Sequence, residues 1–155
     1  MDLDQPHDPR WQSLLEAAWA AREFAHAPYS GFRVGAALLT TGGAVVAGCN
    51  VENAAYPLCT CAERGTIAAA VSQGLLKPGG LAALVVVTEA EDLTPPCGAC
   101  RQVLVEFAST LPVLLANRRE RAIHDLAALL PWAFTARDFG PPDLMPNLSK
   151  GRPKA

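Results

Sequence analysis

The sequence has few charged residues and no cluster of basic ones. Charged side chains make up 18% of the 155 residues, and the formal net charge is −2. Sequence-independent binding of DNA or RNA depends on a positively charged surface. The composition therefore disfavours a nucleic-acid polymer as a partner.

Long hydrophobic runs are also missing, since no apolar stretch reaches the roughly 20 residues of a membrane-spanning helix. The first residues, Met-Asp-Leu-Asp-Gln-Pro, are acidic and polar, unlike a secretory signal. We therefore expect no membrane association and a cytoplasmic location. Cysteines stay reduced in that compartment, and an odd number of five fits a disulfide framework poorly. Clustered thiols then favour metal binding.

Half of the residues are hydrophobic, and their spacing predicts alternating helices and strands in one domain, 1–155. We expect a core over about 9–139 and flexible tails at 1–7 and 141–155. Helices are predicted from Pro9 to before Pro28, Ala62 to Gln73, Cys97 to Ala108 and Asp125 to Leu130. Strands are predicted at Phe32–Leu39, Ala44–Cys49, Leu81–Thr88, Val113–Ala116 and Arg121–Ile123. This order predicts a five-stranded sheet with helices on both faces.

Two short motifs carry the chemistry. Cys61 is followed by Glu63 in Cys-Ala-Glu-Arg, and Cys97 and Cys100 share a C-x-x-C spacing in Pro-Cys-Gly-Ala-Cys. Three thiolates can hold zinc and leave its fourth position open, as in catalytic zinc sites. A glutamate beside such a site that is not itself a ligand can carry protons. The motifs therefore predict a catalytic zinc centre.

Simpler interpretations exist for the same residues. The cysteines could be small buried hydrophobic residues, and Glu63 could only complement the dipole of its helix. A closed structural zinc site would need a fourth ligand, for which Cys49 and Cys59 are candidates. No histidine lies in either motif. Two cysteine motifs with a neighbouring glutamate favour the catalytic interpretation.

Arg64 is expected to support the metal centre without binding the metal. Three thiolates and Zn²⁺ sum to a charge of about −1, which weakens the metal's effect on a bound water. Helix N-termini and the adjacent Arg64 can offset this excess charge. We therefore expect Arg64 to donate a hydrogen bond to a ligand sulfur.

The sequence resembles the small, three-cysteine cytidine deaminases from about Trp11 to Phe139. The resemblance rests on Ala-Pro-Tyr-Ser at 27–30, Phe-Arg-Val-Gly-Ala-Ala-Leu at 32–38, Gly-Cys-Asn-Val-Glu-Asn-Ala-Ala-Tyr at 48–56, Cys-Ala-Glu-Arg at 61–64, Pro-Cys-Gly-Ala-Cys-Arg-Gln-Val at 96–103 and Leu-Leu-Pro-Trp-Ala-Phe at 129–134. It implies a three-layer α/β/α fold with a mixed sheet. It also implies a homotetramer with one Zn²⁺ per subunit and shared active sites.

The resemblance also implies roles for individual residues. Zinc would be held by Cys61, Cys97 and Cys100, and Glu63 would carry protons between water, N3 of cytosine and the leaving ammonia. Phe32 would pack against the base, and the backbone of Ala62 would also contact the base. Asn50 and Glu52 would bind the ribose 3′-hydroxyl. Ala54 and Tyr56 would reach a neighbouring subunit's site, and Phe134 would be supplied by yet another subunit. From the residues alone, Phe32 could equally be an inward-facing strand residue.

The expected activity is zinc-dependent deamination of cytidine and 2′-deoxycytidine to the uridines in pyrimidine salvage. One alternative is a deaminase of another cytosine substrate, either a blasticidin-like antibiotic or a base within RNA or DNA. The ribose-binding Asn50 and Glu52 favour the free nucleoside. The other alternative is a zinc-stabilised binding module without catalysis, which would need a fourth protein ligand.

Overall fold

The computed structural model describes residue 3 and residues 5–139, and a five-stranded sheet forms its centre. The strands are β1 (Gly35–Thr40), β2 (Val45–Cys49), β3 (Leu81–Val87), β4 (Pro112–Ala116) and β5 (Arg121–Asp125), in the spatial order β2-β1-β3-β4-β5. Strand β1 pairs antiparallel with β2 and β3, β3 pairs parallel with β4, and β4 pairs antiparallel with β5. The expected mixed sheet is confirmed.

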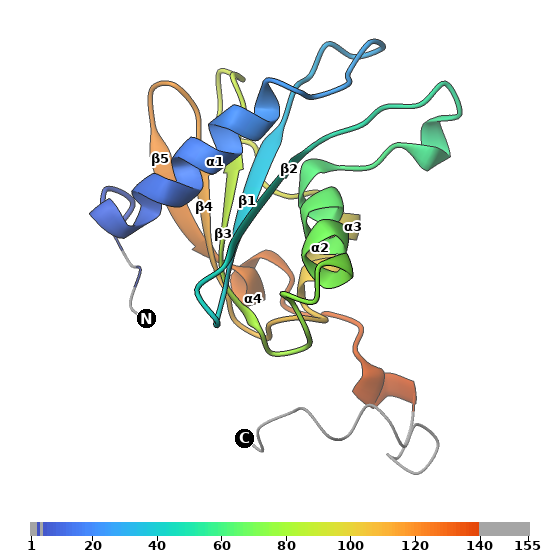
Figure 1. The fold of residues 1–155 in the computed structure, drawn as a ribbon. Helices are drawn as coiled ribbons and strands as arrows, with labels where there is room; N and C mark the ends of the chain where they lie inside the picture. Colours follow the sequence, from blue (N-terminus) through green and yellow to red (C-terminus); the bar gives the residue numbers. More distant parts are fainter. Residues whose placement is uncertain (1–2, 4, 140–155) are drawn as a thin grey trace.

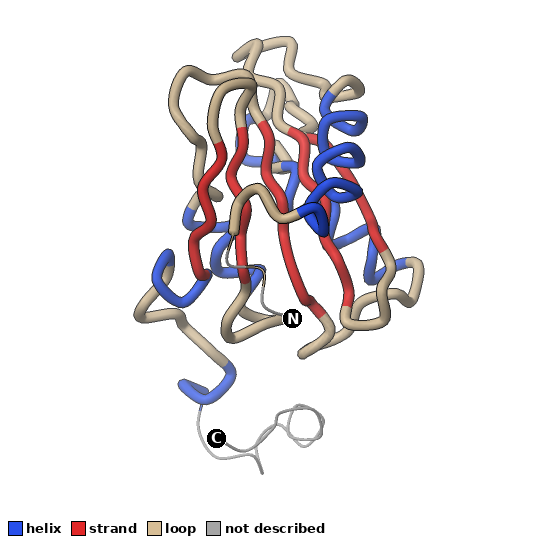
Figure 2. Tube along the Cα trace, turned by 90° about the vertical axis from the view of Figure 1, so that its left-hand side faces the viewer, coloured by secondary structure: helices blue, strands red, loops and turns tan. Residues whose placement is uncertain are grey.

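Helices cover both faces of this sheet (Figure 1, Figure 2). Helix α1 (Gln12–Arg22) lies on one face, and α2 (Ala62–Ser72), α3 (Gly98–Leu104) and α4 (Leu126–Leu129) lie on the other. Short 3₁₀ turns occur at Pro9–Trp11, Tyr56–Leu58 and Ala136–Phe139. The predicted three-layer α/β/α order is confirmed. None of the helices in the described part of the chain has the length and apolarity needed to cross a bilayer.

Alternate residues of the central strands pack into two separate cores. In β3, Val85 and Val87 pack with Trp11 under α1, whereas Leu84 and Val86 belong to the cluster under α2, α3 and α4. Successive side chains of a strand point to opposite faces. A strand covered on both faces therefore has to be apolar throughout, as β3 is.

The prediction of a strand over residues 32–39 was wrong at its start. Strand β1 begins at Gly35, because the Asn50 side chain binds the preceding backbone. Asn50 Oδ1 accepts a hydrogen bond from Val34 N at 2.8 Å, and its Nδ2 donates to Phe32 O at 2.8 Å. Phe32 is therefore an exposed loop residue and not an inward-facing strand residue.

The flexible tails expected at 1–7 and 141–155 stay predictions, although one described residue of the first contacts the core. Leu3 is 2% exposed and belongs to the apolar cluster under α1. The second predicted tail, 141–155, lies outside the described residues.

A stability prediction arises at Gly65, which lies inside α2. Alanine is favoured over glycine in a helix by about 1 kcal/mol. A Cβ at this position would lie 3.6 Å from Cys49 O and 3.8 Å from Thr60 Cγ2, which is ordinary van der Waals contact. We expect Gly65→Ala to raise the free energy of unfolding by about 0.5–1 kcal/mol in a urea titration.

Gly48→Ala is the matched control for this substitution, because a Cβ at Gly48 would lie 2.7 Å from Thr66 Oγ1. This overlap should lower the free energy of unfolding by about 1–3 kcal/mol. A loss of stability in Gly65→Ala would contradict the local geometry of α2.

Candidate active site

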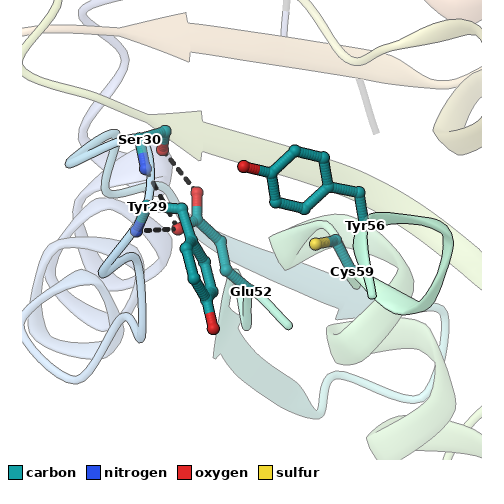
Figure 3. Close-up of a pocket in the computed structure, with 5 residues that line it drawn as sticks. All are labelled: Tyr29, Ser30, Glu52, Tyr56 and Cys59. Carbon is teal, nitrogen blue, oxygen red and sulfur yellow. Dashed lines mark hydrogen bonds between the residues drawn. The ribbon is translucent and has the colours of Figure 1, made fainter. Parts of the chain in front are cut away.

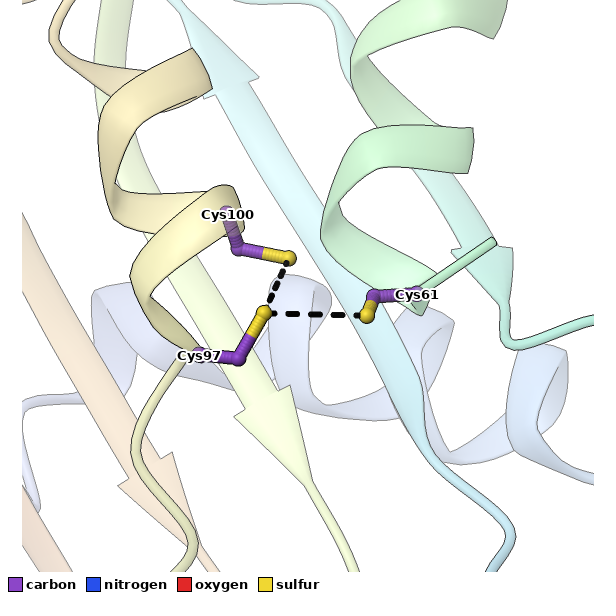
Figure 4. A group of neighbouring side chains, drawn as sticks. All are labelled: Cys61, Cys97 and Cys100. Atoms are coloured by element: carbon purple, nitrogen blue, oxygen red, sulfur yellow. Dashed lines mark hydrogen bonds between the residues drawn. The ribbon is translucent and has the colours of Figure 1, made fainter. Parts of the chain in front are cut away.

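Three cysteine sulfurs converge where α2 and α3 begin (Figure 4). Cys61 precedes α2, Cys97 precedes α3, and Cys100 lies in the first turn of α3. The Sγ atoms of Cys61 and Cys97 are 3.8 Å apart, and those of Cys97 and Cys100 are 3.5 Å apart. Cys100 is buried, Cys61 is half-buried and Cys97 is exposed. One side of the group is therefore accessible from solvent.

The spacing of this group suits a tetrahedral metal. Zinc with Zn–S bonds of about 2.3 Å holds its sulfurs about 3.8 Å apart. All three Sγ atoms lie within 4.8 Å of one another. No further histidine, cysteine or carboxylate among the described residues joins the group. The donor set fits zinc bound by three thiolates with an open fourth position.

Neither sequence candidate for a fourth ligand belongs to the group. Cys59 instead contacts the backbone of Asn53, accepting a hydrogen bond from its N at 3.3 Å and donating to its O at 3.6 Å. Cys49 pairs with Gly35 in the sheet. Within the described residues, the site therefore lacks the fourth ligand of a closed structural site.

Charged and polar neighbours favour thiolate at Cys61. A hydrogen bond from the Cys100 thiol, followed by one from the Arg64 guanidinium, lowers the pKa of Cys61 to about 5. The hydrogen bond to Cys61 raises the pKa of Cys100. Arg64 Nη2 lies 3.9 Å from Cys61 Sγ and also donates to Cys59 O at 2.9 Å. The structure thus contains the contact between arginine and sulfur that the sequence predicts.

Arg64→Gln should reduce the catalytic rate more than the zinc content. We expect a loss of about tenfold in kcat, because neighbours of metal ligands tune the metal they surround. Zinc per chain, measured by atomic absorption, should stay close to the wild-type value because the sulfurs remain. An unchanged kcat would show that Arg64 has no electrostatic role at the site.

Glu63 lies in the first turn of α2, two residues after Cys61. Its side chain is buried, with 4% of the residue exposed. Burial raises the pKa of Glu63, and the negative Cys61 acts in the same direction, whereas a hydrogen bond with Cys100 opposes them. A carboxyl group whose pKa is moved towards neutrality is suited to accept and return a proton.

A pocket of about 290 Å³ lies beside this centre and is lined by Tyr29, Ser30, Glu52, Tyr56 and Cys59 (Figure 3). Glu52 Oε2 accepts hydrogen bonds from the backbone N of Tyr29 at 2.8 Å and of Ser30 at 3.2 Å. The Ser30 hydroxyl donates to Glu52 Oε1. The Ser30 hydroxyl, followed by the Tyr29 amide, lowers the pKa of Glu52, so this carboxylate is ionised at neutral pH.

Backbone pairing joins this pocket to the cysteine centre. Val51 N donates to Thr60 O and Thr60 N donates to Val51 O, both at 2.9 Å. Glu52 and Cys61 follow directly after these two residues. The carboxylate and the first thiol are therefore held on adjacent segments.

The remaining sequence candidates lie in different surroundings. Phe32 is 42% exposed, Tyr56 is 68% exposed and Phe134 is 56% exposed. Ala54 is exposed as well, whereas Ala62 is fully buried. The substrate contacts of all these residues stay predictions. Tyr29 and Ser30 were missed as partners of Glu52, although the Pro-Tyr-Ser-Gly turn at 28–31 marked a loop near the strands.

Comparison with known families identifies the group to which this arrangement belongs. The model of the cytidine and deoxycytidylate deaminase zinc-binding region matches residues 9–115. The chain belongs to this deaminase family. The cytidine deaminase of Sporosarcina psychrophila is 44% identical over 130 residues, covering 83% of this chain and 93% of that protein. That of Halalkalibacterium halodurans is 43% identical, covering 83% and 96%.

Solved structures agree with this membership. A cytidine deaminase from Burkholderia pseudomallei has a TM-score of 0.76 and 51% identity, covering 79% of this chain and 98% of that one. A cytidine deaminase from Mycobacterium tuberculosis has a TM-score of 0.69 and 42% identity, covering 83% and 99%. The expected family and its fold are thus confirmed, and the three cysteines form a group able to hold a metal ion within a zinc-binding deaminase domain.

Proposed function

We propose that this protein catalyses the zinc-dependent hydrolytic deamination of cytidine and 2′-deoxycytidine. The products are uridine or 2′-deoxyuridine and ammonia. The observation that carries the proposal is a three-cysteine group with one accessible side and a buried glutamate next to it, in a chain of the deaminase family. Relatives named cytidine deaminase support the choice of substrate.

The reaction replaces the exocyclic amine at C4 of cytosine with oxygen from water. Cys61, Cys97 and Cys100 would hold zinc, which would supply the Lewis acidity needed to make water a nucleophile at neutral pH. Glu63 accepts a proton as the C4–O bond forms and delivers a proton to N3 of the ring. Glu63 then takes the remaining proton from the hydroxyl on C4 and transfers it to the amine, so that the C4–N bond breaks, the C4 carbonyl forms and ammonia leaves. Its burial supports this role, because the raised pKa of Glu63 makes both directions of transfer accessible.

The pocket beside the cysteine centre is the proposed site for the sugar. Glu52 lines it as an anionic acceptor for the ribose 3′-hydroxyl. Asn50 would share that contact, and its bonds to the backbone at Phe32 and Val34 hold the side chain in one orientation. Phe32, kept exposed by those bonds, would pack on the base. Ala62, which is buried in the first turn of α2, would offer backbone groups to the base.

A homotetramer with shared active sites is part of the proposal. Large apolar side chains stand exposed on the single chain, and among them Trp132 is 95%, Tyr56 68% and Phe134 56% exposed. In a homotetramer, neighbouring subunits would cover such side chains. Ala54 and Tyr56 would reach a neighbouring site, and Phe134 would come from another subunit. We place the enzyme in the cytoplasm, in pyrimidine salvage.

The decisive experiment follows the loss of near-ultraviolet absorbance of cytosine when cytidine or 2′-deoxycytidine is mixed with the purified, zinc-loaded protein. Conversion of both nucleosides with equal release of ammonia supports the proposal. If cytidine stayed unchanged while a blasticidin-like nucleoside or cytosine within a short single strand was converted, the substrate would be that compound and not cytidine. Bound zinc with no conversion of any of them would favour a binding module.

A further inference from the structure

The segment that leads into Cys97 is held by Arg101, which does not belong to the three-cysteine group. Arg101 lies one turn after Cys97 in α3, and its Nε donates a hydrogen bond to Pro96 O at 2.7 Å. Pro96 directly precedes Cys97 in the chain. Because the Pro96 carbonyl and the Cys97 amide share one peptide plane, this bond fixes the direction from which the chain enters Cys97.

The guanidinium of Arg101 is itself anchored from a second side. Its Nη1 donates to Leu129 O, in the last turn of α4, at 2.7 Å. Both bonds are short and charge-assisted, the stronger class of protein hydrogen bonds. Carbonyl groups at a helix end lack partners within the helix, so the bond to Leu129 also satisfies such a group. Arg101 therefore occupies a fixed position between α4 and the entry to α3.

Cys97 is the metal ligand that most needs such support. It is exposed, whereas Cys61 is half-buried and Cys100 is buried. Packing therefore restricts the Cys97 side chain less than it restricts the other two. Its backbone leaves helical geometry at φ −65° and ψ 165°, and no side chain caps α3 there. The orientation of the preceding peptide then becomes the main constraint on the position of Cys97 Sγ.

We infer that Arg101 is a positioning residue for the metal centre. By holding the Pro96 carbonyl, Arg101 places the Cys97 thiolate where it can bind the metal. The inference rests on the zinc site of the proposed function. It assigns Arg101 no contact with substrate. The effect belongs to metal affinity, and it is present in the protein before any nucleoside binds.

The experiment measures the zinc dissociation constant by competition with a chromophoric chelator, in the absence of substrate. Arg101→Gln should raise the dissociation constant about 10- to 100-fold, the usual effect of removing a residue that orients a metal ligand. Arg101→Lys should give a smaller increase, because one ammonium group cannot reproduce the two-sided fork of a guanidinium. The thermal midpoint of each metal-free variant is measured alongside.

Gln102→Ala is the matched control on the same helix. Gln102 Nε2 donates to Phe134 O at 2.6 Å and thus ties α3 to the chain beyond α4 without contacting Pro96. This variant should bind zinc as the wild type does. Equal weakening of zinc binding by Gln102→Ala would mean general loosening of α3 and would overturn the inference.

The outcomes separate this inference from the proposed function. An unchanged zinc dissociation constant in folded Arg101→Gln overturns the inference and leaves the metal site intact. If Arg101→Gln does not fold, the Lys variant decides, and wild-type zinc affinity in it overturns the inference. A wild-type protein that binds no zinc would instead refute the metal site on which the proposed function depends.

Discussion

Replacing Glu63 with glutamine is expected to lower kcat for cytidine by about 10³-fold while the zinc content stays at the wild-type level. Glutamine keeps the shape of the side chain and cannot accept or return a proton. Glu63 is buried, so water has little access to take over the transfer. No described contact makes Glu63 a metal ligand, and the three sulfurs remain in place.

The measurement compares cytidine turnover and bound zinc in the wild type, Glu63→Gln and Glu16→Gln. Glu16 lies on α1, which covers the opposite face of the sheet, so the same chemical change there should leave kcat unchanged. A Glu63→Gln variant with wild-type kcat and bound zinc would remove Glu63 from the mechanism. Loss of zinc together with activity would instead make Glu63 a contributor to metal binding.

Removal of one sulfur should have the second large effect. Structural zinc sites bind with about 10–16 kcal/mol over four ligands, so one thiolate accounts for roughly 3 kcal/mol, a factor on the order of 100 in affinity. We expect Cys100→Ala to weaken zinc binding by at least about that factor and to lose cytidine turnover with the metal.

Cys59→Ala is the matched control for this prediction. Cys59 stands two residues before Cys61 but contacts the Asn53 backbone and not the metal group. Its replacement should leave the zinc dissociation constant unchanged. Loss of zinc from Cys59→Ala would make Cys59 a ligand and would return the closed structural site as the better interpretation.

Much of the fold follows from local sequence signals. The apolar spacing around Trp11 and Leu14 predicts the buried face of α1, and both residues are almost completely buried. The last helix is predicted to begin at Asp125, and there the Oδ1 atom of Asp125 accepts a hydrogen bond from Ala127 N at 2.7 Å and caps α4. These features depend on neighbours within a few residues, so a single sequence carries the necessary information.

The errors lie at the ends of predicted elements. The strand expected from Phe32 starts three residues later, because Asn50 binds the backbone of Phe32 and Val34 from 16 to 18 positions away. The helix expected from Cys97 to Ala108 ends at Leu104, where Phe107 N donates to the Leu104 carbonyl in a tighter turn. Neither change leaves a periodic signal in the sequence.

The same division applies to the site. Residue types and spacing predict that Cys61, Cys97 and Cys100 form one metal group, and their sulfurs converge in the structure. The bonds that hold the site together link residues far apart in the sequence. Glu52 accepts hydrogen bonds from the backbone amides of Ser30 and Tyr29, 22 and 23 positions earlier. Arg101 donates to the carbonyl of Leu129, 28 positions later. Such partners become visible when the folded chain brings them together.

The most direct test of the account titrates zinc into metal-stripped protein and records the rate of cytidine loss, with uridine and ammonia quantified at each point. We predict no turnover without metal and a rate that rises linearly to a plateau at one zinc per chain. Uridine and ammonia should form in amounts equal to the cytidine lost. A chain that binds one zinc through its three cysteines and leaves both cytidine and 2′-deoxycytidine unchanged would contradict the account.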